Sequence, residues 1–281
     1  MNFDFNEEQT MIMDGIARYI REEYDFDRRR SIIESDSACS DDVWRQFSEL
    51  GWLSIPFDES YGGFGGHADD LAGVMLELGK GLIIEPYMST VVVFGSLLNA
   101  SNNDSLKEQL IPRIINGQYK GSFAYAEEQS RFEISDVKTS AQKCGDGYKL
   151  NGTKIAVIDA KESDGLIVTA RTGGSQYGAE GISLFLVDTS AEGVAVSSYN
   201  TMDSHSSSTI NLENVFVTEA NLIVDEGEGF RHIESCLPQI LLCLSAEALG
   251  IMEVLNRLTV EYSKTRKQFG APIGSFQALQ H

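Results

Sequence analysis

The chain has 281 residues, a length that suggests one large domain or two. It carries 22 Lys and Arg against 42 Asp and Glu, which gives a formal net charge of −20. This excess argues against binding to nucleic acid or to an anionic membrane surface, because both need a basic face. It still allows an anionic small ligand, which a few local Arg or Lys residues could hold. The apolar share of 42% argues against disorder.

The sequence shows no sign of a membrane span, a leader or a metal site. Its longest unbroken apolar run is Ile240–Leu244, far shorter than a spanning helix. The first five residues lack a basic region followed by an apolar one, so we expect no signal peptide and a cytoplasmic protein. The four cysteines and four histidines are scattered. We therefore expect free thiols, no metal site and no Cys/His nucleophile.

The first 120 residues have helical spacing and predict an N-terminal helical domain over residues 1–120. Asn6 can cap a first helix, and Ser40 can cap another that ends at Gly51. Three further helical patterns follow, at residues 71–78, 88–98 and 105–117.

Residues 121–228 alternate between apolar and polar, which predicts a middle antiparallel β domain of barrel-like form. Asn151 and Gly152 suit a type I′ turn, so we expect a β-hairpin there. The other expected strands are 166–171, 182–187, 194–198, 209–212 and 215–217.

Helical spacing returns over residues 229–281, where apolar residues recur from Ile233 to Tyr262. A helix of about 35 residues would be roughly 50 Å long and would belong to a bundle or a subunit interface. Its apolar surface is wider than one stripe, so we expect self-association. The predicted fold class is α+β multidomain: a helical N-terminal domain, a middle β domain and the start of a C-terminal helical bundle.

Two motifs favour ordinary structural explanations. Residues 63–68 fit a dinucleotide-binding glycine pattern, but their flanks are helical. A connecting loop, or a loop lining a ligand pocket, is the better interpretation. Glu127 and Glu128 point to opposite faces of a strand, so they make a poor catalytic pair and suggest a solvated strand end.

The most specific segment runs from Arg266 to Gln280 and reads R-K-Q-F-G-x-P-I-x-x-F-Q-x-x-Q. It resembles the C-terminal signature of the acyl-CoA dehydrogenase family. Residues 61–66 (Y-G-G-F-G-G), 150–154 (L-N-G-T-K) and 246–250 (A-E-A-L-G) match the family as well, and the resemblance covers the whole chain in order. Residues 28–30, 129–131 and 181–188 are similar to the bacterial pimeloyl-CoA dehydrogenase small-subunit branch.

The resemblance implies an FAD-dependent oxidoreductase that introduces an α,β double bond into an acyl-CoA thioester. In the family, FAD lies between the β domain and the C-terminal helices, and a neighbouring subunit holds its adenine end. The implied partners are the acyl-CoA substrate, an electron-transfer flavoprotein as electron acceptor, and further chains in a homo- or hetero-oligomer (a dimer of dimers).

The flavin-side positions that the resemblance implies depart from the family pattern. They are Tyr125, Ala126, Glu127, Ser135, Ala156 and Ile158. Ala126 stands where the family has a flavin-contacting Thr, and the segment at 156–158 lacks the family's Trp and Thr. The adenine-side positions match the family better, and they are Arg266, Phe269, Ile273 and Gln277. Arg266 corresponds to the arginine near the FAD pyrophosphate, a role that suits a permanently charged fork.

The general base is missing from the position that the resemblance implies on the long helix, where Ile240 stands. The family's other location for this glutamate would lie beyond His281, so we expect a C-terminally truncated chain with no assigned catalytic residue. Glu247 is a weak candidate. The alternative function is a non-catalytic partner that completes the FAD site of a sister chain. A stable but functionless fold is a third possibility.

Overall fold

The first part of the chain is helical, as the apolar spacing predicts. The structure is a computed structural model that describes residues 4–35, 37 and 39–281. Residues 1–3, which belong to the N-terminal stretch where no signal peptide is expected, lie outside the described residues. The helices are α1 (Glu7–Glu23), α2 (Phe26–Ile33), α3 (Asp41–Glu49), α4 (Ala68–Lys80), α5 (Gly95–Asn99) and α6 (Asp104–Ile115). Short helical turns occur at η1 (Trp52–Ser54) and η2 (Glu59–Tyr61), and the segment η3 (Met88–Phe94) is a π-helix.

Side-chain caps explain where these helices begin. Asn6 accepts a hydrogen bond from the Gln9 backbone N–H at 2.8 Å, and Gln9 accepts one from the Asn6 backbone at 2.9 Å. This reciprocal box begins α1, and Ser40 begins α3 by accepting from the Val43 N–H. Helix α2, which Asp25 caps, was not predicted from the sequence. The glycine-rich residues 63–67 form the loop between η2 and α4, as expected, and Ala68 begins α4.

The middle of the chain is a curled seven-stranded sheet of half-barrel form. Its strands are β1 (Gly121–Ala124), β2 (Ser140–Cys144), β3 (Gly147–Ile158), β4 (Gly165–Arg171), β5 (Ile182–Asp188), β6 (Val194–Asn200) and β7 (Ser206–Thr218). The order is β1-β4-β2-β3-β7-β6, with β5 also paired to β4. Most pairs are antiparallel, but β4 runs parallel to both β1 and β2, so the sheet is mixed.

The hairpin predicted at Asn151 and Gly152 is wrong. β3 continues straight through both residues, and its turn to β2 lies earlier, at Gly145 and Asp146. Asn151 and Gly152 instead lie at a shift of register against β7. A Cβ on Gly152 would lie 2.4 Å from Thr139 Oγ1, so this glycine serves close backbone approach at a bulge rather than a turn. The two short strands expected around residues 209–217 are likewise one strand, β7.

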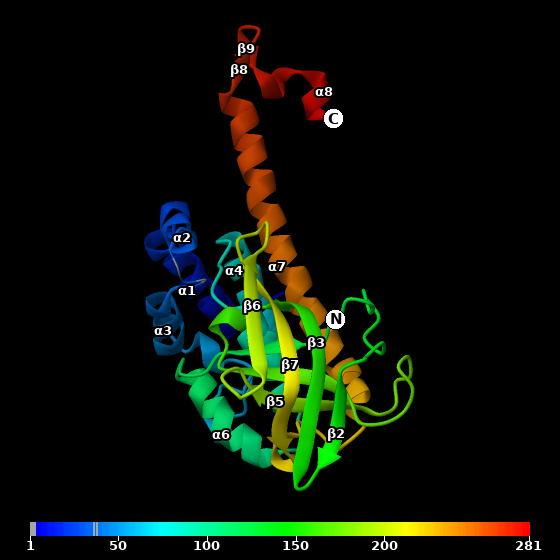
Figure 1. Cartoon of the computed structure of the whole chain (residues 1–281). Helices are drawn as coiled ribbons and strands as arrows, with labels where there is room; N and C mark the ends of the chain where they lie inside the picture. Colours follow the sequence, from blue (N-terminus) through cyan, green and yellow to red (C-terminus); the bar gives the residue numbers. More distant parts are fainter. Residues whose placement is uncertain (1–3, 36, 38) are drawn as a thin grey trace.

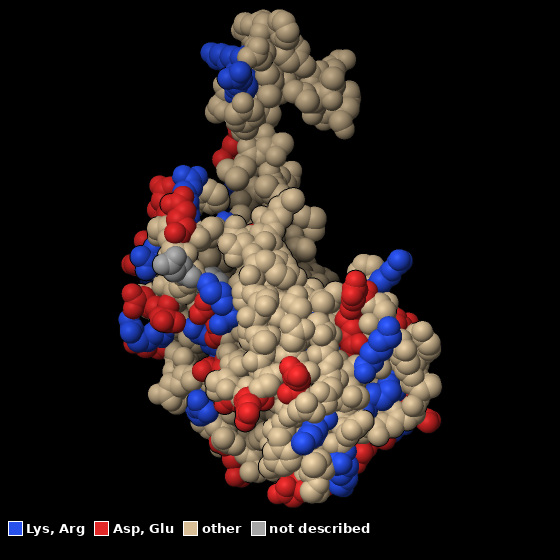
Figure 2. Space-filling view, viewed as in Figure 1, with Lys and Arg blue, Asp and Glu red and all other residues tan. Residues whose placement is uncertain are grey.

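The last part of the chain is one 37-residue helix, α7 (Gly229–Thr265), which rises out of the molecule (Figure 1). A small tip follows it, made of β8 (Lys267–Gln268), β9 (Ala271–Pro272), the turn η6 (Ile273–Ser275) and α8 (Gln277–Gln280). Lys and Arg side chains gather on one side of this tip (Figure 2). By length and composition α7 could cross a membrane. Because an unpaired bundle helix has the same character, this is weak evidence for a span.

Two glycines let α7 press against α4. A Cβ on Gly79 would lie 2.3 Å from the Glu247 carbonyl oxygen, and one on Gly250 would lie 2.0 Å from the Leu76 carbonyl oxygen. The backbones of the two helices therefore touch at this crossing. The crossing fixes which side chains of α7 face the rest of the molecule, including that of Glu247.

The hydrophobic core has two parts. One joins the helices to one face of the sheet, through residues such as Ile167, Leu184 and Ile233. The other fills the inside of the curled sheet, around Tyr148 and Phe185. The sheet, the N-terminal helices and the N-terminal half of α7 thus pack together, and the candidate site lies where they meet.

Candidate functional site

The structure brings four of the expected flavin-side positions together on the β domain. Tyr125 and Ala126 follow β1, and Ala156 and Ile158 lie at the end of β3. The two segments are joined because the Ile155 N–H donates to the Ala126 carbonyl oxygen at 2.9 Å. Tyr125, Ala156 and Ile158 are exposed, so they form a small, open and largely apolar surface.

Glu127 lies directly beneath that surface and is not a solvated strand end. It is buried, and its Oε1 accepts a hydrogen bond from the Lys154 ammonium at 2.7 Å. The backbone N–H groups of Lys138 and Thr139 donate to the same carboxylate at 2.8 and 3.0 Å. Burial alone would raise the pKa of Glu127, but the Lys154 charge and these hydrogen bonds lower it to about 2. The side chain is thus occupied in holding the surface together.

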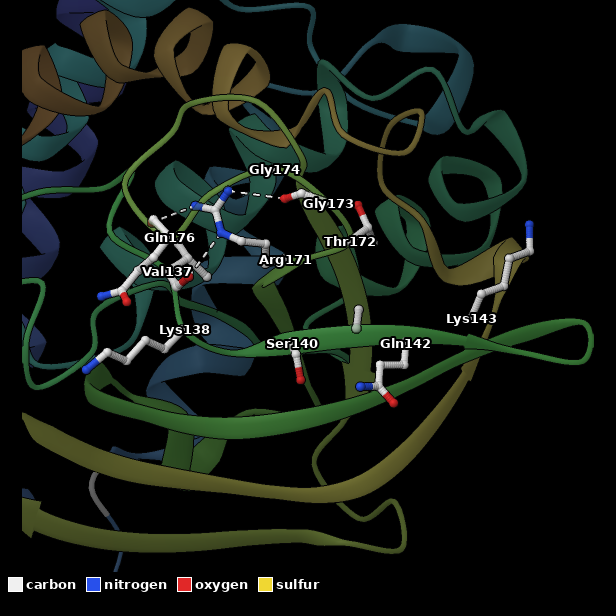
Figure 3. Close-up of a pocket in the computed structure, with 11 residues that line it drawn as sticks. Val137, Lys138, Ser140, Gln142, Lys143, Arg171, Thr172, Gly173, Gly174 and Gln176 are labelled. Carbon is white, nitrogen blue, oxygen red and sulfur yellow. Dashed lines mark hydrogen bonds between the residues drawn. The ribbon is translucent and has the colours of Figure 1, made fainter.

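Ser135 lies in the loop that follows, and Arg171 holds that loop in place. The Ser135 hydroxyl donates to Glu133 Oε1 at 2.8 Å, so it remains within its own loop. The Arg171 guanidinium donates to the Ser135 carbonyl oxygen at 2.9 Å. It also donates to the carbonyl oxygens of Val137 and Gln176 at 3.1 and 2.9 Å and reaches that of Gly173 (Figure 3). Arg171 therefore ties the loop after β1 to the loop after β4.

The four expected adenine-side residues come together at the tip of α7. The Ile273 N–H donates to the Arg266 carbonyl oxygen at 2.8 Å, which closes the β8–β9 turn. Phe269 is 95% exposed and packs edge-on against Phe276, with 6.3 Å between ring centroids. Arg266 is exposed, and its guanidinium has no ion-pair partner among the described residues. Gln277 begins α8 beside this group.

The structure does not bring the flavin-side and adenine-side residues together within one chain. The tip lies at the far end of α7 from the β domain (Figure 1), and a helix of 37 residues is about 55 Å long. Each of the two groups of residues fits one part of FAD. The open apolar surface suits the flat flavin ring, and the exposed Arg266 guanidinium suits the pyrophosphate. One FAD that contacts both groups must therefore lie between two chains.

The position expected for the base holds a side chain that cannot take a proton. Ile240 is half-buried on α7 and packs against the helical core. Glu247 lies two turns further along and faces a cavity of about 200 Å³. Burial raises the pKa of Glu247, although His205 opposes the shift.

This cavity lies between α4, η3, the end of β3, the β6–β7 turn and α7, and it borders the candidate flavin surface through Ile158. Apolar residues make up part of its wall: Met75, Leu78, Ile83, Met88, Ile158 and Leu244. Its acidic and basic residues are Glu85, Asp159, Asp203, His205 and Glu247. None of the first four was predicted from the sequence as a site residue. Glu85 could have been noticed, since it interrupts an apolar stretch before Pro86.

Comparison with known proteins gives the same family along the whole chain. Three family patterns match: Acyl-CoA dehydrogenase, N-terminal domain (residues 6–118), middle domain (122–215) and C-terminal domain (227–281). The chain is 32% identical over 285 residues to "Probable acyl-CoA dehydrogenase YngJ" of Bacillus subtilis, covering all of this chain and 74% of that protein.

Solved structures agree with this match. Butyryl-CoA dehydrogenase from Megasphaera elsdenii superposes with a TM-score of 0.89 at 25% identity, covering 100% of this chain and 75% of that one. The FAD complex of PigA superposes with a TM-score of 0.91 at 26% identity, covering 100% and 74%. The chain belongs to the acyl-CoA dehydrogenase family, because all three domains of the family match it in order and it is 32% identical to a probable acyl-CoA dehydrogenase.

Proposed function

We propose that this chain is a subunit of an FAD-dependent dehydrogenase that forms an α,β double bond in an acyl-CoA thioester. One observation carries the proposal: the exposed surface at Tyr125 and Ile158 adjoins a partly open, partly apolar cavity on α7. A flat cofactor on the surface and an acyl chain in the cavity would be neighbours. When bound, FAD supplies the acceptor for the hydride that leaves Cβ of the thioester.

The chain's own residues would position the reactants. The Glu127–Lys154 pair and Arg171 fix the backbone around the flavin surface, so that its N–H groups keep their directions. Arg266 of a second chain would hold the pyrophosphate. Removing the α-proton of a thioester needs a positioned carboxylate, which typically supplies about 10²–10⁴-fold in rate. Ile240 cannot do this, so the proton acceptor would come from Glu247 or from another polypeptide segment.

A second candidate function is a non-catalytic partner that lends its α7 tip to the FAD of a sister chain. Two observations favour it: Ile240 stands at the expected base position, and the Arg266 guanidinium at the tip has no ion-pair partner among the described residues. As partners we propose an electron-transfer flavoprotein as electron acceptor and further copies or sister chains in a homo- or hetero-oligomer.

Two measurements separate these functions. The first is the amount of FAD bound per chain, for the purified chain alone and co-expressed with a sister chain. The second is anaerobic loss of flavin absorbance on mixing with saturated acyl-CoA. A dehydrogenase subunit binds about one FAD per chain, and Ile240→Glu increases its bleaching. A lending partner binds FAD only with its sister, and Ile240→Glu then changes nothing. A chain that binds neither FAD nor acyl-CoA in any combination contradicts both functions.

A further inference from the structure

The cavity bordered by Ile158 is unusually acidic for a space with so much apolar wall. Four carboxylates line it, those of Glu85, Asp159, Asp203 and Glu247, against the single basic side chain of His205 among the described lining residues. Burial opposes protonation of His205, but the nearby carboxylates outweigh it and raise the pKa of His205. Even with His205 charged, the carboxylates outnumber the cation.

Two of the four carboxylates are already satisfied by neighbours. Asp159 Oδ2 accepts a hydrogen bond from the Ser89 hydroxyl at 2.6 Å, and its Oδ1 lies 3.6 Å from His205 Nδ1. Asp203 Oδ1 accepts from the Thr201 hydroxyl and from the His205 backbone N–H. These two residues and His205 form a connected polar group at one side of the cavity.

The other two carboxylates are less well satisfied. Glu85 is only 2% exposed; its Oε1 accepts one long hydrogen bond from the Ser40 N–H at 3.4 Å, and its Oε2 has no hydrogen-bond partner among the described residues. The Tyr24 hydroxyl lies beside this carboxylate and opposes the rise in its pKa. Glu247 reaches the cavity from α7, and no hydrogen bond or ion pair joins its carboxylate to any described residue. A buried carboxylate left without a partner is costly, so such groups are normally paired with a cation or kept protonated.

We propose that this cavity receives an acyl chain ending in a compact cation, such as an ammonium group, which Glu85 and Glu247 bind. The inference rests on the proposed function and names its substrate class. Met75, Met88 and Leu244 would pack around the methylene groups. The cavity of about 200 Å³ leaves room for a short chain. A short amino- or trimethylammonio-acyl chain fits this size.

The electrostatics of the cavity support the same ligand. Burial raises the pKa of both Glu85 and Glu247. A cation bound between them would favour their ionised forms, so binding should release protons to the solvent. A neutral chain of the same shape gives no such release and leaves the two carboxylates unpaired.

The test compares two thioesters of equal shape by titration calorimetry with the 281-residue chain. One is 4-(trimethylammonio)butanoyl-CoA, and the other is its neutral tert-butyl analogue, 5,5-dimethylhexanoyl-CoA. Repeating the titrations in buffers of different ionisation enthalpy counts the released protons. The variants are Glu85→Gln and Glu247→Gln, and the matched control is Glu234→Gln, an exposed glutamate on the same helix.

We expect the cationic thioester to bind at least tenfold more tightly and to release protons, and we expect either variant to remove most of this preference while Glu234→Gln keeps it. Equal binding of the two thioesters by the unaltered chain overturns the inference and leaves the proposed function intact. If neither thioester binds, the proposed function fails. Butylammonium and butan-1-ol then test the cavity alone: binding of the ammonium that Glu85→Gln abolishes supports the inference, and equal or absent binding overturns it.

Discussion

The Lys154 ammonium lies 2.7 Å from Glu127 Oε1, and both side chains are buried beneath the candidate flavin surface. Lys154 also donates to the Thr169 hydroxyl at 2.8 Å on β4. A single buried cation therefore connects the end of β1, the middle of β3 and β4. The family motif at residues 150–154 thus contributes through a side chain that never reaches the surface.

Removing one partner of this pair should be strongly destabilising. Lys154→Met leaves the Glu127 carboxylate buried and uncompensated, and we expect it to lower the free energy of unfolding by about 3–5 kcal/mol. Urea unfolding followed by circular dichroism measures the loss. Lys143→Met is the matched control, because Lys143 pairs with Glu219 at the surface. The double variant Glu127→Gln/Lys154→Met should recover part of the stability; a loss as large as that of Lys154→Met would contradict the pairing.

The same pair predicts how stability depends on acid. The pKa of Glu127 is lowered to about 2 in the folded chain from an ordinary value of 4.5. The folded state then binds fewer protons than the unfolded state between these values, so stability falls as pH drops from about 4.5 towards 2. Glu127→Gln should flatten this part of the pH profile of the urea midpoint. An unchanged slope in the variant would assign the acid sensitivity to other carboxylates.

The crossing of α4 and α7 should be intolerant of any side chain at Gly250. A Cβ there would lie 2.0 Å from the Leu76 carbonyl oxygen, so Gly250→Ala must push the helices apart. We expect a lower melting temperature for it. Gly15→Ala is the matched control, since a Cβ on this α1 glycine meets nothing within 4 Å. The control should gain up to about 1 kcal/mol from better helix propensity, and equal losses in both variants would contradict the close crossing.

The tip of α7 should control FAD retention. Arg266→Ala removes a charge-assisted contact worth roughly 1.5–3 kcal/mol, which is about a tenfold to hundredfold loss in affinity. Fluorescence titration of the apoprotein with FAD measures it. Lys267→Ala is a suitable control because it removes a neighbouring exposed charge from the same tip. Arg171→Ala is not, because Arg171 holds two loops together. Equal affinities for both tip variants would remove Arg266 from the site.

The exposed face of α7 should drive self-association. Its exposed apolar residues include Leu249, Met252, Leu255 and Leu258, more than a helix in water normally shows. We expect multi-angle light scattering at micromolar concentration to find dimers or larger assemblies. Leu255→Glu/Leu258→Glu should shift the population towards monomer. A sharp monomer peak for the unaltered chain would contradict the prediction.

The sequence predicted those parts of the fold that depend on local signals. Caps at Asn6 and Ser40 and the apolar spacing of α7 act within a few residues, so they can be read directly. Asn151 and Gly152 misled because a turn dipeptide also suits a bulge, and only the distant Thr139 decides between the two. The mixed order of the sheet is similarly a long-range property.

For the candidate site too, the residues in local motifs could be predicted from the sequence, and those brought together by long-range packing could not. The resemblance pointed to Tyr125, Ile158 and Arg266 and implied that a neighbouring subunit holds the adenine end of FAD. It did not show that a 37-residue helix separates Arg266 from the other two residues within one chain. The cavity residues Glu85, Asp159 and His205 come from three separate parts of the chain. No sequence motif joins them, and only packing makes them neighbours.

The length of α7 has a consequence for how cofactor and assembly depend on each other. If one FAD contacts Ile158 of one chain and Arg266 of another, it binds the pair and neither chain alone. Binding and association are then linked by mass action. Each raises the affinity of the other by the same factor. Diluting the protein would release the cofactor, and adding the cofactor would hold dilute chains together. FAD would then stabilise the subunit interface as well as serve as the redox group.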